Sequence, residues 1–166
     1  MAEPPAGSAG AEGVPPRAPL AHAGARDPPA APREGEVKAC VLDTHAFVWY
    51  VQGRRVGRSA GRMLREVDRG RCRAWIPAIV PVEIVLLRER GRSAIGIPEL
   101  EATLERNSEL QLLPLDLAQA REFALLPGVH DPFDRMIMAA ARAVGCPLLS
   151  ADTGMQESGL LQVVWD

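Results

Sequence analysis

The sequence predicts an α/β fold in which helices cover both faces of a central parallel sheet. From Val37 onward, short apolar runs of strand length alternate with longer segments of helical periodicity. Such alternation is typical of strand–helix–strand units, because parallel strands need a long crossover between them. No internal repeat is present, so we expect a single domain over residues 37–166.

The N-terminal segment, residues 1–36, differs from the rest in composition. It contains eight prolines and no aromatic residue, so it lacks the apolar surface that would offset the entropy of ordering. Its cations are scattered and it has no apolar core of a signal peptide. We expect a disordered Pro/Ala/Gly-rich tail, and a cytoplasmic protein, because no run of 18 apolar residues is available to span a membrane.

The first predicted strand is the apolar run VKACVL, which ends at Asp43. Nearly continuous apolar character is typical of a strand that is buried on both faces of a parallel sheet. Residues 44–51 are expected to begin a helix directly after this strand. A second helix is predicted over residues 59–70, with Ser59 as its cap and Gly70 at its end.

The next strand–helix pair follows at once. CRAWIP, residues 72–77, is predicted to form the second strand. PVEIVLLRERG, residues 81–91, has helical spacing of its apolar residues and arginines near its end. Pro81 is predicted at the first helical position and Gly91 just after the last turn.

Six further elements complete the alternation. Asp116 is placed to cap one of them, and Gly145 is placed to end another. The predicted elements are a helix over 98–107, an extended segment over 110–115, a helix over 116–128, a helix over 132–144, a strand over 147–152 and a last strand over 160–166.

Cysteine usage and charge restrict the class of protein. The three cysteines, Cys40, Cys72 and Cys146, are far apart and odd in number, which indicates reduced thiols and not a disulfide framework or a zinc site. The net charge is only −2, yet eight arginines crowd into residues 54–73. This segment is predicted to form either a basic surface beside an acidic centre or an ordinary solvated helix face.

Four acidic residues occupy equivalent places in the predicted fold. Asp43 and Asp152 follow apolar strands, whereas Glu83 and Asp134 fall on the first turns of predicted helices. Helices that follow parallel strands begin at the edge of the sheet where the strands end, and ligands bind at that edge. We therefore expect the four carboxylates to converge.

Each acid also has a purely structural interpretation. Asp43 could cap the following helix, and Asp152 could be a turn residue. Glu83 could complement a helix dipole. Asp131 is a natural N-cap, and Asp134 three residues later could complete a capping box with it. These alternatives stay open at the level of sequence.

Converging carboxylates suggest a bound divalent cation. Without one they repel each other and raise each other's pKa values. Mg²⁺ and Mn²⁺ prefer oxygen ligands, commonly a few carboxylates together with waters. Such an ion can polarise a phosphodiester and activate a water, so the predicted chemistry is metal-assisted phosphodiester hydrolysis.

Four stretches resemble the PIN-domain VapC-type toxin ribonucleases of type II toxin–antitoxin systems. They read VLDTHAFVWY, IPAIVPVEIVLLRERGR, LLPGVHDPFDRMIMAAARA and PLLSAD, and the resemblance covers the chain from Val37 to the end. It implies a three-layer α/β/α fold and a hydrolase that cleaves RNA internally with Mg²⁺ or Mn²⁺. It also implies a homodimer, a small cognate antitoxin and a tRNA or ribosomal RNA substrate.

The resemblance carries over to individual residues. Four acids match the catalytic and metal-holding acids of the family: Asp43, Glu83, Asp134 and Asp152. Three residues match supporting positions: Asp131, Ser150 and Arg135. Ser150 would support the site beside Asp152, Asp131 would lie nearer the periphery, and Arg135 would pair with a carboxylate or phosphate. His45 is expected to be a structural or rim residue and not a metal ligand.

Two departures from the family pattern stand out. Where the family often has a serine before the helix glutamate, this sequence reads IVPVE, and we expect Pro81 to supply the helix start before Glu83. The resemblance also begins at Val37. We therefore expect residues 1–36 to be a dispensable tail or the product of a start assigned too far upstream.

Other functions remain open to the sequence. One alternative is a PIN nuclease that is not a toxin and acts in RNA or DNA processing. Another is a catalytically silent binding module, against which the presence of all four acids argues. An aspartyl-phosphate phosphatase is disfavoured, because His45 stands where that class has a second aspartate.

The remaining candidates concern substrate contacts. The arginines of residues 54–73 could hold phosphates beside the acids, or form a solvated or antitoxin-binding face. Trp49 and Tyr50 could stack a base, although their place after a buried strand also suits the core.

Overall fold

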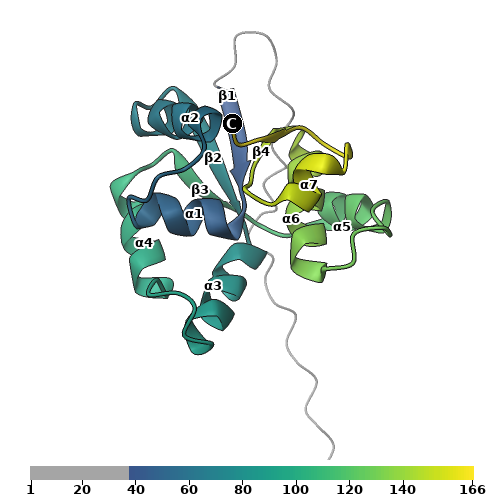
Figure 1. The fold of residues 1–166 in the computed structure, drawn as a ribbon, viewed down its shortest axis with the longest axis horizontal. Helices are drawn as coiled ribbons and strands as arrows, with labels where there is room; N and C mark the ends of the chain where they lie inside the picture. Colours follow the sequence, from purple (N-terminus) through teal and green to yellow (C-terminus); the bar gives the residue numbers. More distant parts are fainter. Residues whose placement is uncertain (1–37) are drawn as a thin grey trace, which may run out of the picture.

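The structure, a computed structural model, describes residues 38–166, so the tail predicted over residues 1–36 lies outside it (Figure 1). A five-stranded sheet forms the centre, with strand order β3-β2-β1-β4-β5 and every neighbouring pair parallel. The strands are β1 (Lys38–Leu42), β2 (Cys72–Pro77), β3 (Leu110–Leu113), β4 (Leu148–Leu149) and β5 (Val163–Val164).

Seven helices connect and cover these strands in the described part of the chain. They are α1 (Thr44–Val51), α2 (Arg58–Asp68), α3 (Ile79–Glu89), α4 (Ile97–Arg106), α5 (Leu117–Ala124), α6 (Pro132–Val144) and α7 (Thr153–Glu157). In Figure 1, α1, α2 and α4 lie to the left of the strands, and α5, α6 and α7 lie to the right. The predicted three-layer α/β/α fold with a central parallel sheet is confirmed.

The core lies between the sheet and the two helix layers. Phe47 of α1 and Ile84 of α3 are fully buried on one side, Ile137 of α6 is buried on the other, and Ile76 and Leu148 are buried within the sheet. Burial of side chains of this size is the main favourable contribution to folding. None of the helices within residues 38–166 is both long enough and apolar enough to cross a membrane.

Two helix starts differ from the prediction. Helix α3 begins at Ile79 after Ala78, so Pro81 is its third residue and not its first. Proline is tolerated there because the N–H groups of the first turn have no partner within the helix. Helix α2 begins after Gly57 and not at Ser59, and no side chain caps it. Helix α7, which follows Asp152, was not predicted.

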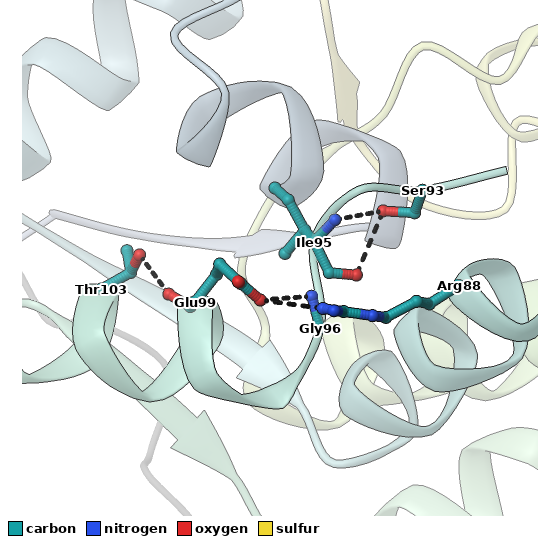
Figure 2. A network of polar contacts seen from close by, with 6 residues as sticks. All are labelled: Arg88, Ser93, Ile95, Gly96, Glu99 and Thr103. Carbon is teal, nitrogen blue, oxygen red and sulfur yellow. Dashed lines mark hydrogen bonds and ion pairs between the residues drawn. The ribbon is translucent and has the colours of Figure 1, made fainter. Parts of the chain in front are cut away.

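Helix α4 is held at its start by a polar network (Figure 2). The Glu99 carboxylate accepts from the Gly96 N–H at 2.7 Å and from Arg88 of α3 at 3.2 Å. Ser93 accepts from the Ile95 N–H at 3.0 Å, and the Thr103 hydroxyl donates to the Glu99 carbonyl. These bonds satisfy backbone groups at the α3–α4 connection and join the two helices.

Gly57 lies where the C-terminal segment approaches α2 most closely. A Cβ atom on Gly57 would lie 2.1 Å from the Trp165 carbonyl oxygen, and that oxygen accepts from the Ala60 N–H at 3.0 Å. We expect Gly57→Ala to lower the free energy of unfolding by about 1–3 kcal/mol, because backbone atoms would have to separate. Gly128→Ala is the matched control, since nothing lies within 4 Å of a Cβ there. Equal denaturant midpoints for the two variants would contradict this account.

Candidate active site

Asp43 lies at the end of the central strand β1 and is the N-cap of α1. Its Oδ1 atom accepts from the Ala46 N–H at 2.6 Å, and its Oδ2 atom accepts from the Ser150 hydroxyl. The side chain is almost fully buried, with 4% exposed. Burial raises the pKa of Asp43, and the bonds from Ala46 and Ser150 oppose that rise by stabilising the charged form.

Ser150 joins two of the predicted acids. It follows β4, which pairs with β1 through Leu149 and Leu42, and it is fully buried. Its hydroxyl donates to Asp43, and its oxygen accepts from the Asp152 N–H at 3.0 Å. The sheet pairing therefore brings the chain around Asp152 next to Asp43.

Replacing Ser150 by alanine tests this connection. The Ser150→Ala variant would leave a buried carboxylate oxygen and a backbone N–H without their partners, so we expect a loss of about 1–3 kcal/mol in unfolding free energy. Denaturant unfolding measures it. Ser108→Ala provides the comparison, because Ser108 is exposed and should change stability by less than about 0.5 kcal/mol. Equal losses in both variants would count against a structural role for the Ser150 hydroxyl.

Asp152 caps α7 from the carboxyl end of the sheet. Its Oδ1 atom accepts from the Met155 N–H at 2.7 Å, and the side chain is exposed. The turn interpretation and the site interpretation are thus compatible, since one carboxylate oxygen forms the cap and the other makes no hydrogen bond within the described residues.

Glu83 is the fifth residue of α3, two residues further into the helix than predicted, because the helix begins at Ile79. Its Oε2 atom accepts from the Thr44 hydroxyl at 2.5 Å. Thr44 is the first residue of α1 and only 1% exposed. This partly buried bond ties Glu83 to the segment that carries Asp43, and it fixes the direction of the Glu83 carboxylate.

Asp131 and Asp134 lie at the start of α6. Asp131 is the N-cap, and its Oδ1 atom accepts from the N–H groups of Phe133 at 2.8 Å and Asp134 at 3.1 Å. Within residues 38–166 no hydrogen bond joins the Asp134 carboxylate to the chain, so Asp134 does not complete a capping box.

The pKa of Asp134 reflects the burial of its carboxyl and the negative charges around it. That pKa is raised to about 6, first by burial and then by the negative charges of Asp131, Asp152, Glu83 and Asp43, in that order. Asp131 lies on the same first turn of α6, whereas Asp152, Glu83 and Asp43 come from three other segments of the chain. The structure therefore brings the predicted acids to one end of the sheet, where a bound cation would relieve their repulsion.

No ion pair joins these acids to a basic side chain in the part of the chain that the structure describes. The ion pairs found there all involve other acids: Glu66, Glu99, Glu109 and Glu122. Over the same residues, no three His, Cys, Asp or Glu side chains are close enough together to enclose a metal ion directly. The acids therefore form an open electronegative cluster and not a closed metal cage.

Arg135 contacts the neighbouring helix α5 and not a carboxylate, and its predicted pairing with a phosphate stays a prediction. Its Nε atom donates to the Phe123 carbonyl at 2.9 Å, and its guanidinium lies 4.0 Å from the centre of the Phe123 ring. These contacts hold α6 against α5, and no ion pair joins Arg135 to an acid among the described residues. An arginine on the first turn of a helix beside an aspartate gives no sequence signal for this direction.

The end of the basic segment, from Arg69 to Arg73, lies apart from the acids. Cys72, at its end, pairs with Lys38, the first residue of β1, whereas Asp43 follows the last residue of that strand. A five-residue strand spans roughly 16 Å, so the end of α2 and the start of β2 lie toward the opposite edge of the sheet from the acids. The start of α2 instead contacts Trp165, which follows β5 on the same edge as Asp43. Two of the arginines are also paired with Glu66 of α2, Arg69 at 3.2 Å and Arg71 at 2.6 Å.

Thr44 is the site residue that the sequence analysis missed. Its hydroxyl contacts Glu83 across 39 residues of chain, and only the fold brings the two together. The available signal was its position directly after Asp43 at the first turn of a helix, where a hydroxyl points toward neighbouring carboxylates.

Comparison with known proteins identifies the family to which the fold belongs. The family model described as the PIN domain matches residues 40–159. No curated protein matches the sequence.

Several solved structures have a similar fold. A chain of VapBC2 from Rickettsia felis bound to a promoter DNA fragment is 16% identical, with a TM-score of 0.59, over 77% of this chain and 99% of that one. DNA-bound VapBC from Salmonella typhimurium is 16% identical, with a TM-score of 0.56, over 76% and 97%. FitAcB from Neisseria gonorrhoeae is 18% identical, with a TM-score of 0.53, over 75% and 95%.

The family model spans most of the chain, including the strand that leads to Asp43 and the segments that carry Glu83, Asp134 and Asp152. The central five-stranded parallel sheet is consistent with the fold of that domain. The chain belongs to the PIN domain family.

Proposed function

We propose that this protein is a metal-dependent endoribonuclease and the toxin of a toxin–antitoxin pair. The observation that carries the proposal is the cluster of Asp43, Glu83, Asp134 and Asp152 with no basic partner among the described residues. Membership of the PIN family and similarity to chains from VapBC and FitAcB structures support it.

The donor set fits a hard divalent cation. Mg²⁺ keeps several of its waters and binds through one or two carboxylates, so a site of this kind needs no closed cage of protein ligands. Asp43, Glu83, Asp134 and Asp152 would hold Mg²⁺ or Mn²⁺ directly or through waters, and Asp131 would add negative charge at the rim. When bound, the ion would neutralise charge at the phosphodiester and lower the pKa of a water, which would make hydroxide available as the nucleophile.

The protein contributes preorganisation. Ala46 and Ser150 orient both oxygens of Asp43, and Thr44 orients Glu83. Fixed carboxylates require no rearrangement when the cation arrives. The same negative charge repels a bare phosphodiester, so this cluster favours RNA only together with cations.

Partner proteins are part of the proposal. A small cognate antitoxin would inhibit the enzyme, and two copies would form a homodimer. Large apolar side chains exposed on α5 and the loop before it, Leu115, Leu117 and Leu125, support a protein contact in that region. The substrate class that we propose is a structured RNA, either tRNA or ribosomal RNA.

RNA cleavage by the purified full-length chain tests the proposal. Incubation with total tRNA and with ribosomal RNA should give discrete fragments with Mg²⁺ or Mn²⁺ and none with excess EDTA. Single- and double-stranded DNA of similar length should stay intact. Cleavage of DNA instead would favour a nuclease of DNA processing, and intact substrates together with no metal binding by calorimetry would favour a silent binding module.

A further inference from the structure

Four neighbouring side chains form an aromatic and cationic surface, which we call the α1 track. They are His45, Trp49, Trp165 and Arg54. The ring centres of His45 and Trp49 are 6.2 Å apart in an edge-to-face arrangement, and those of Trp49 and Trp165 are 5.5 Å apart. The Arg54 guanidinium lies 5.1 Å from the centre of the Trp49 ring. Such a sequence of rings and a guanidinium offers flat faces to a stacking ligand.

The α1 track is accessible and held in place. His45 and Arg54 are exposed, and Trp49 and Trp165 are partly exposed. The Arg54 N–H donates to the Trp49 carbonyl at 2.9 Å, and the Trp165 carbonyl accepts from the Ala60 N–H at 3.0 Å. The two tryptophans therefore sit on anchored backbone, although they come from opposite ends of the domain sequence.

One end of the α1 track adjoins the acidic cluster. His45 is on the first turn of α1, two residues after Asp43, and Trp49 is one helical turn further along the same face. Asp43 is the N-cap of the same helix, so its carboxylate and the His45 side chain leave the chain within one turn of each other. The track therefore leads away from the candidate active site along the outer face of α1.

The other end of the α1 track carries positive charge. Arg55, Arg58 and Arg62 follow Arg54 in the loop and in α2, and all are exposed. None of these arginines forms an ion pair with a described residue, in contrast to Arg69 and Arg71, which pair with Glu66. Cations without acidic partners are available to phosphates.

We propose that the α1 track binds a single-stranded segment of RNA next to the phosphodiester that is cleaved. This inference rests on the proposed nuclease function and names the path of its substrate. Bases would stack on Trp49 and Trp165, and Arg54 with its neighbouring arginines would contact phosphates. Aromatic platforms beside cations are how proteins hold single strands without reading their sequence.

The chemistry favours a single strand over the alternatives. A duplex hides its base faces, so it could use the arginines but not the tryptophan rings. A protein partner of acidic character could also use the arginines, yet continuity with the acidic cluster through His45 gives a substrate strand a direct route to the site. The arginines of the basic segment would then contact RNA phosphates at a distance from the acids.

The test measures binding in EDTA, so that no cleavage occurs. A fluorescein-labelled oligouridylate is titrated with the full-length chain, and anisotropy gives the dissociation constant. We expect Trp49→Leu and Trp165→Leu each to weaken binding by at least about fivefold, as loss of base stacking does. Arg54→Gln should weaken binding and reduce the salt slope by about 0.7. A duplex RNA should bind Trp49→Leu and the wild type equally.

Matched controls come from the same chain. Trp75 has Arg73 lying 5.5 Å from its ring centre, so Trp75→Leu removes a similar tryptophan–arginine pair outside the α1 track. Arg121→Gln removes an exposed arginine on α5 that forms no ion pair with a described residue. Both controls should bind as the wild type does. Circular dichroism checks folding. If Trp49→Leu does not fold, the affinity and salt slope of the exposed Arg54→Gln variant decide whether the α1 track binds RNA.

The outcomes separate this inference from the proposed function. Wild-type cleavage of RNA combined with unchanged binding by the Trp49, Trp165 and Arg54 variants would overturn the α1 track and leave the nuclease proposal standing. Strong binding that the variants weaken, without cleavage in Mg²⁺ or Mn²⁺, would support the track and refute the nuclease. Unchanged RNA affinity with loss of self-association on gel filtration would assign the surface to protein contact and overturn the inference.

Discussion

Asp43→Asn and Asp134→Asn are each expected to lower the rate of RNA cleavage by a factor on the order of 10² to 10⁴. Asparagine keeps the shape and one acceptor oxygen but removes the charge that would hold the cation. Stabilisation of the transition state by a bound metal is worth several kcal/mol, which corresponds to this range. Initial rates on a defined tRNA in saturating Mn²⁺ measure the effect.

The choice of asparagine protects the fold in this experiment. The Oδ1 atom of Asp43 caps α1, and an asparagine side chain can accept the same bond from Ala46. Glu105→Gln is the charge-matched control, because Glu105 is exposed on α4 and belongs to no ion pair among the described residues. Full activity in either aspartate variant would refute the assignment of the cluster as the active site.

The same Asp134→Asn change is expected to stabilise the protein in the absence of metal, by about 1–2 kcal/mol at pH 7.5. The pKa of Asp134 is about 6 in the folded protein against roughly 3.9 in an unfolded chain. A shift of this size corresponds to about 3 kcal/mol, which we reduce because the carboxyl is only partly buried. Stability and activity therefore oppose each other at this residue.

The upward shift of the Asp134 pKa determines the pH range in which wild-type stability changes. Below about pH 4 the carboxyl is protonated in both states, and Asp134 costs nothing. As the pH rises from about 4 to 6, the unfolded chain releases the proton first, so wild-type stability falls and then remains lower. Urea titrations with EDTA should show the unfolding free energies of Asp134→Asn and the wild type diverging over this pH interval.

Added metal should reverse the difference in unfolding free energy between Asp134→Asn and the wild type. Mn²⁺ or Mg²⁺ that binds only the folded state stabilises the wild type in proportion to the logarithm of its concentration. The Asp134→Asn variant should respond less, and Glu105→Gln should behave as the wild type does. A wild type whose unfolding midpoint is independent of both pH from 4 to 6 and Mn²⁺ would contradict the electrostatic description of the cluster.

The parallel sheet and most helices were predictable because local signals agreed with the fold. VKACVL has the apolar continuity of a central strand, and its residues Lys38–Leu42 form β1. Asp116 and Gly145 begin α5 and end α6 as expected, because a carboxylate cap and a left-handed glycine act within one turn.

The remaining features depend on contacts that no local pattern encodes. The start of α3 at Ile79 follows from packing and not from Pro81, which only permits it. Arg135 turns to Phe123 because α5 lies beside α6. The Thr44–Glu83 bond joins residues that only the folded sheet brings together. Convergence of the acids could be predicted from their places at strand ends, whereas the direction of each carboxylate could not.

Three of the acidic positions begin helices: Asp43 begins α1, Asp131 begins α6 and Asp152 begins α7. In each, Oδ1 accepts backbone N–H groups. The second oxygen makes no hydrogen bond within the described residues in Asp131 and Asp152, and in Asp43 it accepts from the Ser150 hydroxyl, so it is the oxygen through which a ligand would be held. A change from aspartate to asparagine conserves the first task and abolishes the second. Inactive descendants of such a domain could therefore arise by single substitutions without loss of folding, and keep every surface through which a partner is recognised.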